Sequence, residues 1–189
     1  MSEIPLLTRD EEIGLAKKIE RARRKFRRSV LCCDYALRTT FETLKRVHEG
    51  ELPFDRTIKI SLTERLSKEQ IQARMPHNLK TLGCLLDSNH KAFKTLLSKA
   101  SSKQEKTDAR LHFLRGRQKA VCLVEELSLR TRRILPLMKQ MANFADRMEF
   151  LQCEIGQLKG QRTNTAKHQR TNLKRELRDL MILTQETPS

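Results

Sequence analysis

The chain has 189 residues, of which 33% are charged, 38% are hydrophobic and 4% are aromatic. This composition favours an elongated helical protein with a narrow core over a thick globule, because each helix supplies one apolar stripe and little more. The formal net charge is +16, from 39 Lys and Arg against 23 Asp and Glu. A surplus of this size indicates a polyanionic partner, most simply nucleic acid.

No segment has the length of a membrane span, and the N-terminus lacks a signal-peptide pattern. We therefore expect a cytoplasmic protein with no membrane partner. The cysteines are odd in number, scattered and without paired spacing, which argues against a disulfide framework and a zinc site: Cys32, Cys33, Cys84, Cys122 and Cys153. We expect them to be reduced and mostly buried. The histidines show no ligand spacing, and the sequence contains neither a Gly-rich phosphate loop nor a nucleophile set beside a base, so we expect no enzyme, cofactor or metal.

The first expected element is an amphipathic helix over residues 9–30. Thr8 and Glu11 have the spacing of a capping box, and three acidic residues follow in the first turn, at the positive end of the helix dipole. Apolar residues then recur at spacings of three and four: Ile13, Ala16, Ile19, Ala22, Phe26 and Val30.

Residues 5–20, with the sequence PLLTRDEEIGLAKKIE, resemble region 1.2 of the primary bacterial sigma factors, and residues 38–54 resemble the start of the variable helical insert in planctomycete-type members. The resemblance implies a role in transcription initiation, with the RNA polymerase core and the non-template strand of promoter DNA near the discriminator as partners. The aromatic segment that usually precedes this pattern is not matched. At this length we expect the N-terminal portion of a sigma factor, because regions 2 to 4 are absent from the sequence.

A dense basic stripe lies on the same helix. Residues 17–28 contain eight Lys and Arg and one acid, Glu20. Lys or Arg side chains that neutralise phosphates release condensed counterions, so this face suits nucleic acid. The candidate nucleic-acid-binding residues are Lys17, Lys18, Arg21, Arg24, Lys25 and Arg28. The alternatives are an ordinary solvated face or a surface that pairs with an acidic protein.

A second helix is expected to end near His48, before Gly50 and Pro53, with Asp34 as its cap. Residues 56–62 alternate polar and apolar side chains, which allows a short extended stretch, but no partner strand is evident and we expect a loop. A capping box at Ser67 opens a short helix that we expect to end before Pro76, where a third helix begins and continues to about residue 100.

Residues 101–104 read as a polar linker before a fourth helix, and Pro136 is expected to kink or restart the chain. A heptad-like seam then follows: Ile134, Met138, Met141, Ala145, Met148, Ile155 and Leu158. Residues 161–165 form the expected turn to a last helix, which gives an antiparallel hairpin with its tip near Arg162. Around the tip is a second basic cluster, for which contact with nucleic acid, contact with polymerase and a solvated end all remain open: Lys159, Arg162, Lys167, Arg170, Lys174, Arg175 and Arg178.

We therefore expect an all-α, elongated protein of five to seven helices with an antiparallel hairpin arm. Its expected divisions are a region 1.2-like helix (1–31), a helical part of the insert (32–103) and the arm (104–189). The expected function is that of the N-terminal, DNA-binding portion of an RNA polymerase sigma factor. The alternatives are a protein-binding helical module or sigma-derived regulator that binds polymerase without DNA, and a non-specific nucleic-acid binder.

Overall fold

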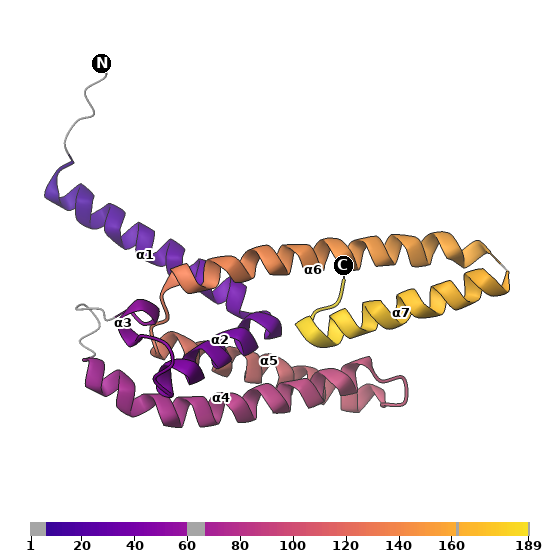
Figure 1. The fold of residues 1–189 in the computed structure, drawn as a ribbon, viewed down its shortest axis with the longest axis horizontal. Helices are drawn as coiled ribbons and strands as arrows, with labels where there is room; N and C mark the ends of the chain where they lie inside the picture. Colours follow the sequence, from indigo (N-terminus) through magenta and orange to yellow (C-terminus); the bar gives the residue numbers. More distant parts are fainter. Residues whose placement is uncertain (1–6, 60–66, 162, 189) are drawn as a thin grey trace, which may run out of the picture.

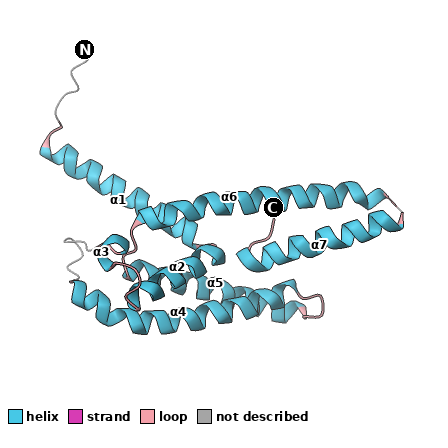
Figure 2. Ribbon diagram, in the orientation of Figure 1, coloured by secondary structure: helices cyan, strands magenta, loops and turns pink. Residues whose placement is uncertain are grey.

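The computed structural model describes residues 7–59, 67–161 and 163–188. These residues form seven α-helices and one 3-10 helix, and the all-α prediction is confirmed (Figures 1 and 2). The helices are α1 (Arg9–Leu31), α2 (Asp34–His48), α3 (Phe54–Thr57), α4 (Lys68–Leu97), α5 (Lys103–Glu126), α6 (Thr131–Gln157), η1 (Leu158–Gly160) and α7 (Asn164–Thr184).

The main core lies where α2, α4 and α5 meet the last turn of α1 and the start of α6. Its largest fully buried side chains include Leu31, Leu44, Leu82, Leu127 and Ile134. Figure 1 shows α1 projecting from this core towards the N-terminus, and α6 with α7 extending from it on the other side. The molecule is elongated because α1 and the α6–α7 pair extend beyond the core in different directions.

α6 and α7 run side by side in opposite directions (Figure 1). α6 gives way to η1 at Leu158, and Thr163 caps α7 by accepting a hydrogen bond from the Ala166 amide at 3.3 Å. The expected tip residue, Arg162, lies outside the described residues.

Three of the described helices begin with a complete capping box, in which the side chain of the cap residue accepts a hydrogen bond from the amide three residues later, and the side chain of that later residue accepts one from the amide of the cap residue. Those at Thr8 and Ser67 were expected, and the third joins Ser102 to Glu105. The linker therefore ends earlier than the sequence suggested, since α5 starts at Lys103.

The prediction that Pro76 separates two helices is wrong, because α4 continues through it. The apolar stripe before and after the proline shares one face: Ile71, Met75, Leu79, Leu82 and Leu86 are all buried. Packing of this continuous stripe against α2 and α5 outweighs the local cost of the missing amide.

Pro136 likewise lies inside α6 and does not restart the chain. The break falls earlier, at residues 127–130, where Ser128 adopts a left-handed φ of 51°. Leu129 there forms an isolated antiparallel bridge with Ile58. Residues 56–59 are thus not a plain loop: Thr57 ends the short α3, and Ile58 finds a partner 71 positions along the chain.

The buried seam of α6 differs from the expected one. Met138 and Ala145 are exposed, whereas Leu137 and Leu151 are buried and Phe144 is half-buried against Tyr35. The other five expected residues are buried or half-buried as predicted, so the shift by one position is confined to Met138 and Ala145. The observed seam keeps alternating spacings of three and four: Ile134, Leu137, Met141, Phe144, Met148, Leu151, Ile155 and Leu158.

Two expectations about small side chains are also corrected. Only Cys33 is buried, while Cys32, Cys84, Cys122 and Cys153 are exposed. Asp34 does not cap α2: Cys33 holds the cap position, and Asp34 is a buried helical residue that accepts a hydrogen bond from Arg38 Nε at 2.7 Å. Within the described ranges, no helix combines the length and hydropathy needed to cross a bilayer.

Candidate nucleic-acid interface

α1 starts with a well-formed cap. The Thr8 amide donates to Glu11 Oε2 at 2.8 Å, and the Glu11 amide donates to Thr8 Oγ1 at 3.4 Å. The Thr8 hydroxyl also donates to Glu11 Oε2, at 2.9 Å. The two hydrogen bonds that the carboxylate accepts, first from the Thr8 amide and then from the Thr8 hydroxyl, lower the pKa of Glu11 below its ordinary value. The ionised carboxylate is also favoured at the positive end of the helix dipole, so the cap is charged at neutral pH.

Only the C-terminal part of α1 enters the core. Val30 and Leu31 are buried, and Phe26 packs partly against the core. In the earlier turns, Ile13 and Ile19, both counted as core-facing in the sequence pattern, are 44% and 49% exposed. The apolar stripe of α1 is therefore real, but this chain covers only its last third.

An ion-pair network fixes α1 where it leaves the core. Arg27 Nε donates to Glu125 Oε1 at 2.9 Å and Arg27 Nη2 donates to Oε2 at 3.4 Å, with both side chains only 14% exposed. Arg27 also reaches Thr131 at the start of α6, at 3.3 Å. A two-point Arg–carboxylate pair sets orientation as well as distance, so this contact fixes α1 against α5 and α6.

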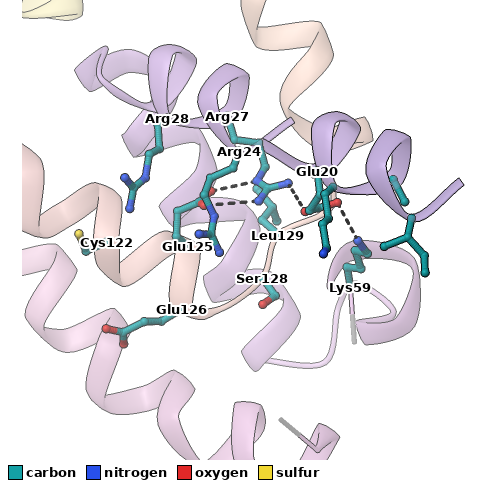
Figure 3. Close-up of a pocket in the computed structure, with 13 residues that line it drawn as sticks. Glu20, Arg24, Arg27, Arg28, Lys59, Cys122, Glu125, Glu126, Ser128 and Leu129 are labelled. Atoms are coloured by element: carbon teal, nitrogen blue, oxygen red, sulfur yellow. Dashed lines mark hydrogen bonds and ion pairs between the residues drawn. The ribbon is translucent and has the colours of Figure 1, made fainter. Parts of the chain in front are cut away.

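The network continues towards the N-terminus through the single acid of the basic stretch. Glu20 lies 3.7 Å from Arg27 Nη1 and 3.4 Å from Lys59 Nζ (Figure 3). Glu20 thus joins α1 to the segment after α3. Because about half of the Glu20 and Lys59 side chains is exposed, water screens this outer pair strongly.

An open groove of about 870 Å³ runs between α1 and the end of α5. Its α1 wall includes Ile13 and Ala16, and its other wall includes Leu129, Cys122, Glu125 and Glu126. Figure 3 shows Arg24 next to Glu125 and Arg28 on the Cys122 side of the groove. The groove therefore combines apolar residues with charges of both signs: the α1 wall is mainly cationic, with Glu20 as its acid, and the other wall has two carboxylates and Lys59.

This groove divides the six candidate residues into two sets. Lys17, Arg24 and Arg28 line it, within the field of Glu125 and Glu126, whereas Lys18, Arg21 and Lys25 do not. All six side chains are exposed. The structure thus places all six along one helix, and three of them share the groove with Glu125 and Glu126.

Sequence reasoning missed the residues that organise this region. Arg27 was one of eight basic residues in its window, and nothing local distinguishes it from the others. Its partner Glu125 is 98 positions away, and Lys59 is 39 positions from Glu20. Within the described part of the chain, no group of three or more His, Cys, Asp or Glu is placed to hold a metal ion.

Comparison with protein families matches residues 1–24 to the family described as Sigma-70 factor, region 1.2. No curated protein and no solved structure matches the chain. The matched residues include the cap and most of the basic stripe of α1. The N-terminal segment is thus similar to region 1.2 of the sigma-70 factors, over 24 of the 189 residues.

Proposed function

We propose that this chain is the region 1.2 and insert portion of a sigma-70-type transcription initiation factor, acting in the cytoplasm on promoter DNA with the RNA polymerase core. One observation carries the proposal: the region 1.2 match falls on a helix that is capped, densely basic and largely uncovered. A helix of this kind presents charge to a partner in a fixed direction.

The mechanism is positional, with no catalysis and no cofactor. Arg27 and the buried end of α1 hold the helix rigidly, while the exposed cations bind phosphates of the non-template strand near the discriminator. We assign the contact first to Lys18, Arg21 and Lys25, because they are exposed and lie outside the groove that Glu125 and Glu126 line. α6 and α7 then brace the insert against polymerase.

Capture of unstacked bases is not assigned to this chain. Single-strand capture depends on aromatic platforms, and the sequence has no Trp, one Tyr and seven Phe. Tyr35 is occupied internally, since it contacts Phe144 and its hydroxyl donates to Gln140 Oε1 at 2.7 Å. The chain therefore sets a strand path and leaves base recognition to the other parts of the assembly.

A second candidate, a module that binds polymerase through protein contacts alone, is favoured by the uncovered apolar stripe. Leu15 is 41% exposed, and Ile13 and Ile19 are exposed to a similar degree. Exposed apolar residues that recur along one helix are typical of a protein-binding face, whereas phosphate contact makes no use of them.

The test uses charge reversal in a reconstituted initiation complex that supplies polymerase core and sigma regions 2 to 4. Replacing Lys18, Arg21 and Lys25 by Glu should reduce discriminator-sensitive open complexes and lower the salt slope of strand binding by about 2. The matched variant reverses Lys17, Arg24 and Arg28, an equal change of net charge, and should have a smaller effect because these cations share the groove with Glu125 and Glu126.

Open complexes that form equally well with the outer variant would exclude the DNA role. If Ile13→Ser with Ile19→Ser then abolished polymerase binding, the protein-binding module would replace it. If neither variant had an effect, α1 would be a solvated surface and both candidates would fail.

A further inference from the structure

α7 carries a second basic stripe, on the pair of helices that extends from the core away from the N-terminal end of α1 (Figure 1). Lys167, Lys174 and Arg178 are spaced by seven and four residues, which places them on one face of the helix, and all three are exposed. Two further basic residues lie between Lys167 and Arg178: Arg175 is exposed, and Arg170 is half-buried. From Lys167 to Arg178 the stripe is about 16 Å long.

The acids of this region do not neutralise the stripe. Glu176 lies on another face of α7, where Arg147 of α6 pairs with it at 2.6 Å. No ion pair joins Lys167, Lys174 or Arg178 to an acidic side chain among the described residues. The α1 stripe differs here, because its inner cations face Glu125 and Glu126 across the groove.

The stripe is also held rigidly at both ends. Thr163 caps the start of α7, α6 supports its length, and Arg117 clamps the residues that follow it. Arg117 donates to the Gln185 carbonyl at 3.0 Å and pairs with Glu186 at 2.9 Å. A charged row on a rigid support loses little conformational freedom when it meets a regular array of charges.

The chemistry of the stripe identifies its partner. Residues 159–189 contain no Phe, Tyr or Trp, so this face offers no platform on which unstacked bases could stack. Duplex DNA presents about one negative charge per 1.7 Å of its axis, and a straight row of cations matches such an array without reading sequence. We propose that the α7 stripe is a second DNA-binding surface, which holds the phosphate backbone of duplex DNA without sequence preference and independently of α1.

The experiment measures binding of the full chain to a labelled DNA duplex of arbitrary sequence over a series of salt concentrations. Replacing Lys167, Lys174 and Arg178 by Glu should weaken binding about tenfold or more at low salt and reduce the salt slope by about 2 to 3. The control changes net charge equally with Arg74→Glu, Lys80→Glu and Lys91→Glu, three exposed residues scattered along α4. The control should have a clearly smaller effect, and circular dichroism should show both variants folded.

A second arm separates this inference from the proposed function. The variant with Lys18, Arg21 and Lys25 reversed should retain the α7-dependent part of duplex binding, whatever its effect on open complexes. Equal losses in the stripe variant and the α4 control would overturn the proposal, because net charge alone would then explain binding. Tighter binding of polyglutamate, or of a single strand of equal length, would overturn it in favour of an acidic protein or an unpaired strand.

Discussion

α1 and α7 both carry basic stripes, but the rest of the chain holds them in different ways. α1 is fixed near one end, by Leu31 in the core and by the Arg27–Glu125 pair at the core's edge. α7 is supported along α6 and clamped where it ends, in a socket that α2, α4 and α5 build. The two stripes therefore differ less in local charge density than in their surroundings, since Glu125 and Glu126 share a groove with the α1 cations. We expect these distant carboxylates, more than the density of cations, to decide which stripe a polyanion binds.

The α7 socket is polar and closely packed. Gln185 is buried in a left-handed conformation with φ of 52°, and the Cys33 thiol donates to the Thr184 carbonyl at 3.5 Å. Burial raises the pKa of this thiol above its ordinary value, so it stays protonated and can donate. α7 is therefore fixed by specific polar contacts at its end as well as by apolar packing along its length.

The largest effect is expected at Gly116, where α5 passes close to α4. A Cβ there would overlap the amide oxygen of Asn89, which is itself 1% exposed and has little room to rotate. Gly116→Ala should destabilise the protein by about 2 to 3 kcal/mol in urea unfolding, because the overlap forces α4 and α5 apart next to Arg117. The control, Gly14→Ala, meets open space on α1 and should be neutral or stabilising. A neutral Gly116→Ala would mean that the socket is loosely packed.

The next effect is expected at the clamp itself. Arg117→Ala removes the hydrogen bond to Gln185, the ion pair with Glu186 and the stacking of the guanidinium on Phe113 at 4.5 Å. We expect a loss of about 2 kcal/mol, since the Gln185 carbonyl is left unpaired while the outer ion pair is half-exposed. Hydrogen exchange should accelerate in the last turn of α7 and not in α1. Acceleration spread over all helices would show that the clamp stabilises the whole fold.

These contacts show what the sequence could and could not predict. The caps at Thr8 and Ser67 were predictable, because both partners of each box lie within three residues. The continuity of α4 through Pro76 was not, since it depends on packing against helices elsewhere in the chain. The six candidate cations of α1 were found from their spacing, but their division by the groove follows from Glu125 and Glu126, about a hundred positions away. Their role in binding stays a prediction.

A smaller effect is expected at the anchor of α1. Arg27→Ala leaves Glu125 without its two-point partner, and we expect a loss of about 1 to 2 kcal/mol, less than at Arg117 because Glu125 lines an open groove from which water can reach the unpaired carboxylate. Arg23→Ala is the matched control on the exposed side of the same helix and should change stability by less than about 0.5 kcal/mol. Limited proteolysis should cut α1 faster in the first variant only. Equal protection of α1 in both would assign its anchorage to Leu31 alone.

The smallest effect concerns the buried charge next to the α7 socket. Burial raises the pKa of Asp34 above its ordinary 3.8, and the hydrogen bond and charge of Arg38 only partly oppose this. His90 of α4 and Arg117 of α5 also act on this carboxyl and favour its charged form. Because the folded state binds the proton more readily, Asp34 should stabilise the protein below pH 3.8, and this contribution should be lost as pH rises through the folded pKa.

His90 works in the opposite direction. Burial is the main cause that lowers its pKa below 6.5, so its contribution is present above pH 6.5 and is lost as pH falls through its folded pKa. Urea unfolding of the His90→Asn variant across the acidic range should isolate the Asp34 slope, and adding Asp34→Asn should flatten it. Each unit of pKa shift corresponds to about 1.4 kcal/mol. The change in unfolding free energy with pH therefore measures how strongly the fold disfavours the charged form of Asp34. A slope that survives in the double variant would assign the pH dependence to carboxylates outside the socket, and the α7 end would then be held by Arg117 without help from Asp34.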